Sequence, residues 1–401
     1  MLRKHWVLIL ILGFTIILKI IFVINVKDLI WDEHAYYIPA AKTYLAGIVD
    51  SNPQHPPLGK EILALGISLF GDNSLGWRFF PILAGLASMV ITYLIAWGLS
   101  KRVLVASLAI FLLGFEPFWF FSSSIAYLEI FLVFFSLLAM LFLLRYLENP
   151  SLVNLVGFSV SIGAGLAVKW SAALLIPAAL ILIIIFGKEK FFTIIKKGFL
   201  SLLIVGSIYV ISYIPFLLSH SISDLLKLQA YIYNFHANLT FEGVAGYYSF
   251  TQKLVYSPFR WLFTGIDTYD LYKHNGTISR LAIVINPMVF YGGLFAFFFY
   301  GIKGFLKRDF AVSFLVIIIA FLIFPWFLVK RVVYFYYLLT AIPLLTILIS
   351  IYLNKFLVNK KRIWDLYAIL ATNGVFFILL LPYLVAIPIP SWYLGWLFGL
   401  L

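Results

Sequence analysis

The sequence predicts an all-α integral membrane protein, built as a bundle of about eleven transmembrane helices. Of its 401 residues, 64% are hydrophobic and 11% are charged, and the mean hydropathy is +1.05. A soluble domain is about 45–50% apolar and about 25% charged. Apolar segments of membrane-spanning length also recur along the whole chain, and most connections between them are only a few residues long. A water-soluble fold could not bury so much apolar surface.

Segments that can cross about 30 Å of hydrocarbon define the predicted helices in chain order. They cover about 6–26, 79–100, 103–121, 124–144, 152–168, 170–187, 198–218, 283–301, 311–329, 332–353 and 364–386. The first segment is predicted to stay in the protein, because its roughly 21 residues exceed the ~7–15 of a signal-peptide core and no small-residue cleavage site follows. We expect residues 1–401 to form one domain without a separate soluble domain, with two longer polar stretches at about 27–77 and 219–282.

The basic residues predict the orientation of the chain in the membrane. With a cytoplasmic N-terminus, the cytoplasmic connections hold 16 Lys and Arg side chains against four acidic ones, the outer side holds twelve of each, and Lys19 lies inside the first span. The two polar stretches then become outer loop 1 and outer loop 2, where chemistry is expected because the cytoplasmic connections are too short to build a site. The net charge of +13 thus reports membrane insertion, and no nucleic-acid partner is expected.

Outer loop 1 begins with two adjacent carboxylates, Asp32 and Glu33, among aromatic residues at the membrane edge. Shielding from bulk water raises the pKa of a carboxylate toward the range that suits a general base. The alternative is an ordinary acidic start of a loop. About twenty residues later comes His55-Pro56-Pro57-Leu58-Gly59-Lys60. Because prolines fix φ, we expect a rigid turn that holds His55 and Lys60 in a set direction.

Cations are also predicted at the outer membrane interface, at Arg78, Lys169 and the pair Lys330-Arg331. Placing an ionisable group close to membrane depth costs free energy, so each of these cations is a candidate for binding an anion. Arginine can bind a phosphate group with two hydrogen-bond donors. Snorkelling toward lipid head groups is the alternative for each. Glu129, a few residues inside the fourth span, is the matching anion and could pair with one of these bases or orient a substrate.

The number and positions of cysteine and histidine residues limit which metal and redox sites the chain can form. The chain has no cysteine, which excludes disulfides, thiolate metal sites and cysteine nucleophiles. Its six histidines are scattered, and no cluster has the spacing of a metal site. No metal site is therefore predicted, although a divalent ion near Glu33 and His55 is left open.

The chain resembles the protein O-mannosyltransferase family in these motifs and in their order. This family is part of the GT-C class of polytopic glycosyltransferases that use a polyprenyl-phosphate sugar. The matching landmarks are collinear over about residues 30–345. They are Asp32-Glu33, His55-Pro56-Pro57-Leu58-Gly59-Lys60, Arg78, Val168-Lys169-Trp170, Tyr256-Ser257-Pro258 to Trp261, Ile285-Asn286-Pro287, Lys330-Arg331 and Tyr334-Phe335-Tyr336-Tyr337. The first two landmarks together are specific, whereas the later ones are weak singly.

The chain departs from the family pattern at three places. Family members often have an Arg and then an Asp-Pro in span four, where this chain has Ser124 and Glu129-Ile130. They often have His-Tyr after the late arginine, where this chain has Tyr336-Tyr337. The soluble lumenal module of eukaryotic members does not fit within 219–282. These differences leave the identity of the acceptor more open than the type of reaction.

The resemblance implies a GT-C fold with an outward-facing cavity above the bilayer. It implies transfer of a sugar, mannose in this family, from a polyprenyl- or dolichyl-phosphate donor to a hydroxyl of a protein Ser/Thr or a glycan. Asp32 would be the general base of a one-step inverting displacement, with Glu33 assisting. The donor phosphate would be bound by Arg78, Lys169, Arg331 and Lys60, and the substrates positioned by His55, Glu129 and Tyr336. No cofactor besides the lipid-linked donor is firmly expected.

Other functions fit parts of the sequence. Within the enzyme class, a lipid A aminoarabinose transferase or a transferase that extends a lipid-linked glycan shares much of this framework. A secondary transporter or flippase also has many spans and a few intramembrane charges, but its ionisable groups usually lie near the bilayer midplane. A structural membrane subunit would leave the landmarks unexplained. The favoured expectation is a multi-pass enzyme of a prokaryotic cell membrane with its site on the outer face and an undetermined oligomeric state.

Overall fold

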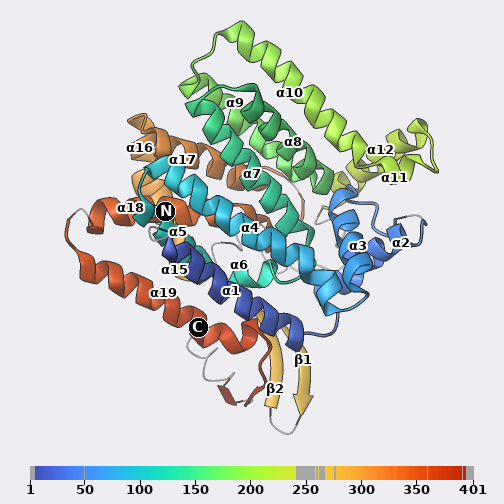
Figure 1. Ribbon diagram of the computed structural model, residues 1–401, viewed down its shortest axis with the longest axis horizontal. Helices are drawn as coiled ribbons and strands as arrows, with labels where there is room; N and C mark the ends of the chain where they lie inside the picture. Colours follow the sequence, from blue (N-terminus) through green and yellow to red (C-terminus); the bar gives the residue numbers. More distant parts are fainter. Residues whose placement is uncertain are drawn as a thin grey trace.

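The computed structural model describes residues 5–48, 50–240, 258, 261, 267–274, 277–329, 331–358, 360–390 and 392–393. Within these residues the fold is a bundle of helices with one small sheet at its edge (Figure 1). The predicted all-α membrane class is therefore confirmed.

Helices account for the whole first part of the chain. They are α1 (Trp6–Asn25), η2 (Glu33–Tyr37), α2 (Ile38–Leu45), α3 (Leu58–Phe70), α4 (Ser74–Ser100), α5 (Val103–Gly114), α6 (Pro117–Ser122), α7 (Leu128–Glu148), α8 (Leu152–Val168), η3 (Trp170–Leu174), α9 (Leu175–Phe186), α10 (Phe191–Ile211), α11 (Ile214–Leu217) and α12 (Ile222–Asn238). The stretch expected as outer loop 1 thus contains three helical segments of its own, η2, α2 and α3.

The second part of the chain adds the sheet and the remaining helices. These elements are β1 (Asp267–His274), β2 (Thr277–Ile283), α15 (Pro287–Phe295), η5 (Ala296–Gly301), α16 (Ile302–Leu306), α17 (Phe310–Ile323), η6 (Phe324–Phe327), η7 (Phe335–Thr340), α18 (Ile342–Leu353), η8 (Asn354–Val358), α19 (Ile363–Leu384) and β3 (Ile389–Pro390). The strands form an antiparallel sheet in the order β1-β2-β3, with Asp267 paired to Ile283 and a register shift between Asp270 and Tyr272.

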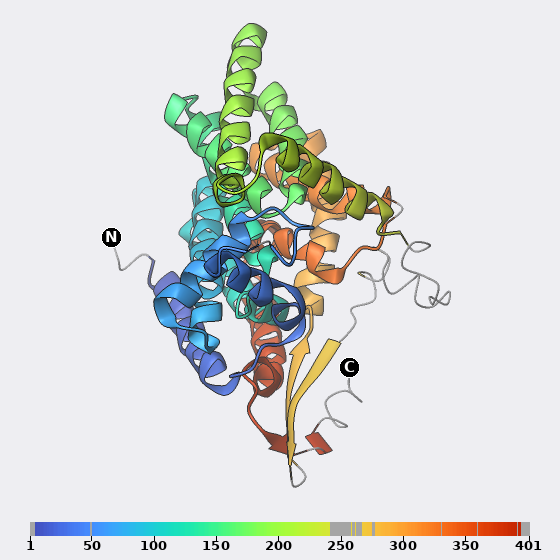
Figure 2. The same ribbon diagram turned by 90° about the vertical axis from the view of Figure 1, so that its right-hand side faces the viewer.

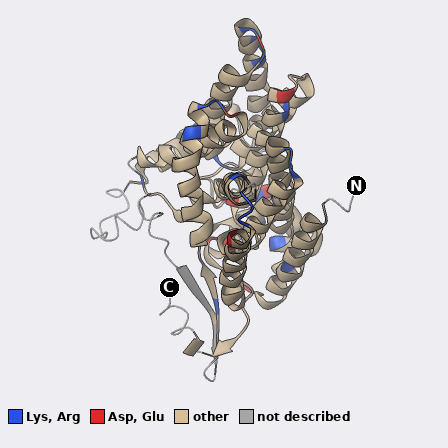
Figure 3. Cartoon of the chain, turned by 90° about the vertical axis from the view of Figure 1, so that its left-hand side faces the viewer, with Lys and Arg blue, Asp and Glu red and all other residues tan. Residues whose placement is uncertain are grey.

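Each predicted span coincides with an apolar helical segment of the described chain. Seven helices are long and apolar enough to cross a membrane, and four shorter apolar helices cover the other predicted spans. The helices are largely free of charged residues (Figure 3). The α10 helix buries only Val205 among its 21 residues, and its exposed surface carries large apolar side chains such as Phe199 and Leu202. That surface is suited to lipid.

The α7 helix lies near the centre of the bundle, where it packs against α4 and α8. Figure 1 shows α10 at one margin of the bundle and α19 at the opposite margin. Side-chain caps mark where several helices begin. Asn73 Oδ1 accepts hydrogen bonds from the backbone N–H groups of Leu75 (3.0 Å) and Gly76 (3.2 Å) at the start of α4, and Asp309 caps α17 in the same way.

Segments that the charge pattern assigns to one side of the membrane meet at one end of the bundle. Three hydrogen bonds join them: Asn25 Nδ2 to the Val385 carbonyl (2.8 Å), His236 Nε2 to the Gln54 carbonyl (2.9 Å) and the Val332 N–H to the Leu239 carbonyl (2.9 Å). Contacts between segments assigned to the other side include Lys101 Nζ to Glu148 (2.6 Å). The packing therefore agrees with the predicted alternation of spans, while the side that faces outward stays a prediction.

Candidate active site

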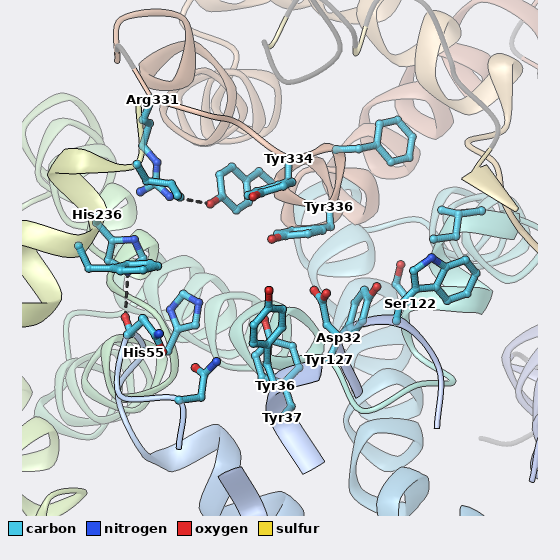
Figure 4. Close-up of a pocket in the computed structure, with 18 of the residues that line it drawn as sticks. Asp32, Tyr36, Tyr37, His55, Ser122, Tyr127, His236, Arg331, Tyr334 and Tyr336 are labelled. Atoms are coloured by element: carbon cyan, nitrogen blue, oxygen red, sulfur yellow. Dashed lines mark hydrogen bonds between the residues drawn. The ribbon is translucent and has the colours of Figure 1, made fainter. Parts of the chain in front are cut away.

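A cavity of about 610 Å³ lies at the end of the bundle where outer loop 1, the end of α12 and the segment after η6 meet (Figure 4). Its lining residues are Trp31, Asp32, Tyr36, Tyr37, Asn52, Gln54, His55, Phe118, Ser122, Tyr127, Phe235, His236, Leu239, Ile283, Arg331, Tyr334, Phe335, Tyr336 and Tyr337. Four of the predicted site residues thus share one cavity, namely Asp32, His55, Arg331 and Tyr336.

Asp32 is presented to the cavity by an irregular backbone. The preceding residue, Trp31, has φ 44°, in the left-handed region that bulky side chains rarely adopt, and the chain then continues as the π-helical turn η2. Strained backbone and π-helical turns are both enriched at functional sites. The Trp31 ring packs edge-on against Phe121 at 5.1 Å between centroids, which holds this conformation in place.

The electrostatic surroundings of Asp32 match those of a general base. Burial and then the Glu129 carboxylate raise the pKa of the Asp32 carboxyl, the Lys169 ammonium opposes them, and together they bring it to about 6. An acid with this pKa is mostly ionised at neutral pH and still has appreciable affinity for a proton. Asp32 faces the same space as Tyr36 and Tyr336 (Figure 4).

Glu33 and Arg78 form an ion pair behind Asp32 and do not line the cavity. Both side chains are 0% exposed. Glu33 accepts hydrogen bonds from Arg78 Nε (2.9 Å) and Nη2 (2.6 Å) and from the backbone N–H of Ala126 (2.7 Å). Arg78 also donates to the carbonyl of Val26 and, at 2.7 Å, to that of Asp28. The donors of Arg78 are used within the protein, so this geometry does not offer its guanidinium to a donor phosphate.

Lys60 is likewise internal. Its ammonium is fully buried, pairs with Asp50, and donates hydrogen bonds to the backbone carbonyls of Asn52 (2.6 Å) and His55 (2.8 Å). Lys60 therefore fixes the turn that leads into α3. That turn brings Asn52, Gln54 and His55 to the cavity, so Lys60 contributes to the site through the loop that it holds.

His55 meets a second histidine, His236, that approaches from α12. The two ring centroids are 5.2 Å apart, and both rings line the cavity. Burial lowers the pKa of His55 well below its usual value, and Lys169 lowers it further. Burial and then Arg331 lower the pKa of His236 to about 4. Both imidazoles are therefore neutral at physiological pH and cannot supply positive charge for a phosphate.

Lys169 and Glu129 form a buried ion pair next to the cavity, which neither residue lines. They are 5% and 3% exposed, and the Lys169 ammonium lies 5.2 Å from the ring centroid of Tyr336. Both residues line a small side pocket together with Tyr336 and Tyr337. Lys169 also lines a second pocket of about 100 Å³ with His55, His236 and Arg331, which places this ammonium beside the cationic part of the site.

Arg331 supplies the guanidinium of the main cavity. Its Nη2 donates to the hydroxyl of Tyr337 at 3.0 Å, and its Nε lies 3.4 Å from the Val332 carbonyl. Among the described residues no carboxylate pairs with Arg331, in contrast to Arg78, Lys60 and Lys169. Arg331 lies on one side of the cavity and Asp32 on another (Figure 4).

Aromatic and hydroxyl side chains form most of the remaining wall. Tyr334 stacks on Tyr336 with ring centroids 5.2 Å apart, and Tyr127 meets Tyr336 at 6.1 Å. Ser122 and Tyr127 were not predicted as site residues, because the apolar segments around them were assigned to transmembrane spans. The aromatic run after Arg331 was the available signal for Tyr334. Of the predicted landmarks, Tyr256, Ser257 and Lys330 lie outside the described residues.

The described residues contain no group of three or more His, Asp or Glu side chains that could hold a metal ion. A divalent ion near Glu33 and His55 would need free carboxylate oxygens. Both oxygens of Glu33 already accept hydrogen bonds, from Arg78, Ile30 and Ala126. The residues present therefore do not fit a metal at that position.

Sequence comparison relates the chain to enzymes that transfer sugars from lipid phosphates. The profile of the dolichyl-phosphate-mannose-protein mannosyltransferase family matches residues 54–217. A polyprenol-phosphate-mannose–protein mannosyltransferase of Mycolicibacterium smegmatis is 36% identical over 115 residues, 27% of this chain and 22% of the relative. The enzyme of the same description from Mycobacterium tuberculosis is 23% identical over 408 residues, 83% of this chain and 77% of the relative. The chain thus matches about a fifth of the length of the first relative and most of the second.

Structure comparison identifies proteins with a similar fold. ArnT from Cupriavidus metallidurans bound to undecaprenyl phosphate superposes with a TM-score of 0.63 and 14% identity, over 98% of this chain and 75% of that protein. At this identity the likeness concerns the fold alone. The resemblance that the motifs indicated is confirmed: the chain is similar in sequence to protein mannosyltransferases and has the fold of the GT-C glycosyltransferases.

Proposed function

We propose that the protein transfers a sugar, most directly mannose, from a polyprenyl-phosphate donor to a hydroxyl group of a protein on the outer face of the membrane. The observation that carries the proposal is the cavity itself, which combines one carboxylate, Asp32, with one guanidinium free of a carboxylate partner among the described residues, Arg331. The names of the relatives, which contain a polyprenol-phosphate-mannose donor and a protein acceptor, support this choice of substrates.

The cationic side of the cavity suits the donor phosphate. Arg331 has donors that can reach a ligand, and Lys169 lies beside it, partly neutralised by Glu129. Two donors of a guanidinium match two phosphate oxygens, and the positive charge stabilises the lipid phosphate as it leaves. The neutral His55 and His236 between these cations add polar surface without further charge.

Asp32 is the proposed general base. Its carboxylate would take the proton of the acceptor hydroxyl while the hydroxyl oxygen forms a bond to the anomeric carbon of the sugar. The bond between that carbon and the phosphate oxygen breaks in the same step, and its electron pair leaves with the polyprenyl phosphate. One displacement inverts the anomeric configuration. No second carboxylate is needed as a nucleophile, since the leaving group is already a phosphate.

In this proposal the remaining predicted residues support the Asp32 carboxylate and the cationic side of the cavity around Arg331. Glu33 and Arg78 fix the irregular turn that carries Asp32, and Lys60 fixes the turn that carries His55. Glu129 holds Lys169 and raises the pKa of Asp32, and Tyr336 forms part of the wall that would face the sugar. Glu33, Arg78 and Lys60 are thus proposed as positioning residues, in place of the direct roles that the sequence suggested.

The outer face is the proposed location because of the charge distribution. The end of the bundle that holds the cavity is formed by segments with equal numbers of acidic and basic residues, whereas the excess of Lys and Arg lies in the connections of the other end. A donor whose lipid tail lies in the bilayer presents its phosphate at the height of the head groups, which is where this end of the bundle would lie.

The proposal is tested by incubating the purified protein, in lipid nanodiscs, with a panel of polyprenyl-phosphate sugars and a serine- and threonine-containing peptide. Mass spectrometry of the peptide and the lipid then identifies the product. We expect a mass increase of one hexose on the peptide with the mannose donor. Absence of transfer from every donor, together with translocation of the lipid in a vesicle assay, would instead support a flippase.

A further inference from the structure

Two side-chain amides of outer loop 1, those of Asn52 and Gln54, line the main cavity without using their oxygens inside the protein. Both residues lie in the turn before α3, and Asn52 is 5% exposed. Within the part of the chain that the structure describes, Asn52 Oδ1 and Gln54 Oε1 are buried and accept no hydrogen bond. Most buried side-chain oxygens in folded proteins have a partner. These two oxygens therefore indicate a ligand that supplies a donor to each.

The backbone that carries the two amides is fixed by other groups of the protein. Lys60 Nζ donates to the Asn52 carbonyl at 2.6 Å, and the Asn52 N–H donates to Asp50 Oδ1 at 2.8 Å. His236 Nε2 donates to the Gln54 carbonyl at 2.9 Å. Figure 2 shows α12, which carries His236, beside the segments of outer loop 1. The main chain of this turn is thus anchored, and the side-chain amides are left for the cavity.

The same turn reaches the proposed phosphate site. His55, which follows Gln54 directly, lines the pocket of about 100 Å³ that contains Arg331. In Figure 4 His55 and Arg331 lie on the left of the cavity and Asp32 lies on the right. The sugar of the donor is bonded directly to the phosphate, so its ring must lie next to this pocket and toward Asp32. Asn52 and Gln54 line the cavity that the ring would occupy.

The charges around the amides favour a neutral sugar. Asp32 is the one carboxylate among the described residues that line the cavity, and His55 and His236 are neutral at physiological pH. Each amide carries a donor and an acceptor, the same pair that a sugar hydroxyl carries. An amino sugar would be matched by a second carboxylate, and an acidic sugar by a cation beyond those proposed for the phosphate, because buried charges need partners.

We propose that Asn52 and Gln54 bind hydroxyl groups of the donor sugar and select a neutral hexose that carries those hydroxyls. This inference rests on the proposed function and names the residues that recognise the sugar. Both are specificity-determining residues, since their amides contact the ring, whereas Lys60 and His236 position them. A site built around a hydroxyl discriminates against an analogue that lacks it, because the buried amide is then left without a partner.

The test compares a polyprenyl-phosphate mannose with its monodeoxy analogues as donors for the full-length protein. The wild type is expected to lose roughly 5- to 100-fold in kcat/KM with at least one monodeoxy donor. Asn52→Leu keeps the size of the side chain and removes its hydrogen-bonding groups. It is expected to lose a similar factor with the mannose donor, with little further loss for the monodeoxy donor that lacks the hydroxyl bound by Asn52. Gln54→Met should behave in the same way with a different monodeoxy donor.

The matched control is Ser51→Ala. Ser51 is the exposed neighbour of Asn52 in the same loop and does not line the cavity. This variant is expected to keep the wild-type kcat/KM with every donor. The comparison of donors in the wild type needs no variant, so it tests the inference even if Asn52→Leu or Gln54→Met fails to fold.

The outcomes separate this inference from the proposed function. Equal kcat/KM of the wild type for the mannose donor and every monodeoxy donor would overturn it, as would an equal loss by Asn52→Leu with all donors. A raised KM for the acceptor peptide, with unchanged discrimination between donors, would assign the amides to the acceptor instead. Absence of transfer from every donor would count against the proposed function itself. Equilibrium dialysis of the same lipids would then decide the inference, which equal affinities for the mannose and monodeoxy lipids would contradict.

Discussion

His236 Nε2 donates a hydrogen bond to the backbone carbonyl of Gln54 at 2.9 Å, across 182 residues of sequence. A carbonyl oxygen only accepts, so the proton of the neutral imidazole lies on Nε2. The bond joins α12 of outer loop 2 to the turn of outer loop 1 that carries His55. Two stretches that are far apart in the chain thus form one wall of the cavity.

This bond predicts different effects for two substitutions of His236. Gln places its amide nitrogen near the position of Nε2 and keeps the donor, whereas Asn is too short to reach Gln54. We expect His236→Asn to raise the KM for the donor by roughly two- to tenfold, as for the loss of one hydrogen bond, and His236→Gln to remain close to wild type. Steady-state kinetics with a radiolabelled donor measure both. Equal effects of the two variants would mean that the bond does not position the site.

Asp32→Asn is expected to lower kcat by about 10²–10⁴-fold, because the amide cannot accept the proton of the acceptor hydroxyl. The KM for the donor should change little, since the phosphate is proposed to bind at Arg331. Asp28→Asn is the matched control, as Asp28 is an exposed carboxylate of the same loop that does not line the cavity. Full activity of Asp32→Asn would remove Asp32 from the mechanism.

The pKa of Asp32, raised to about 6, predicts the acid limb of the pH–rate profile. A base must be deprotonated, so kcat is expected to fall about tenfold per pH unit below pH ~6 and to level off above it. The Glu129 carboxylate raises this pKa, and Lys169 lowers it. Glu129→Gln removes the first effect and leaves the second, so the limb should move to lower pH. A limb that moves to higher pH in this variant would contradict the assignment of the base.

The sequence predicted the bundle well, because membrane-spanning length is a property of local composition. Each of the predicted spans 6–26, 124–144 and 364–386, for example, contains its hydrophobic signal within itself. The sheet was not predicted, since strand pairing such as that between Asp267 and Ile283 depends on contacts that local hydropathy does not encode. Asp32, His55 and Arg331 were predicted for the site, and the structure brings them to one cavity.

The roles of the other cations could not be predicted, because they depend on contacts between distant residues. Arg78 pairs with Glu33 across 45 positions. Lys169 pairs with Glu129 across 40, one of the pairings that the sequence left open without choosing the cation. Lys19, in the middle of α1, illustrates the same limit. Its ammonium donates to the Phe120 carbonyl (2.5 Å) and the Ser123 and Ser124 hydroxyls (2.7 Å each), so it pins the segment that leads to Tyr127. Charge and hydropathy do not reveal such partners.

Arg331→Ala is expected to raise the KM for the donor by about 10–100-fold, the range for losing hydrogen bonds to a charged group. Arg331→Lys keeps the charge without the two-donor geometry and should lie between Ala and wild type. Tyr337→Phe is the control, because it removes only the hydroxyl that accepts from Arg331 at 3.0 Å. Binding of the donor can be measured directly by tryptophan fluorescence or equilibrium dialysis. An unchanged affinity in Arg331→Ala would favour snorkelling of this side chain to head groups.

Arg78→Met is expected to destabilise the protein rather than to weaken donor binding directly. It leaves the 0% exposed Glu33 without its cation, and loss of one partner of a buried pair costs about 3–5 kcal/mol. The measurement is the unfolding temperature in detergent, which should fall clearly. The double variant Glu33→Gln/Arg78→Met removes both charges and should recover part of the loss. If Arg78→Met instead kept the wild-type unfolding temperature and raised the KM for the donor as much as Arg331→Ala, Arg78 would bind the phosphate, as its place in the sequence first suggested.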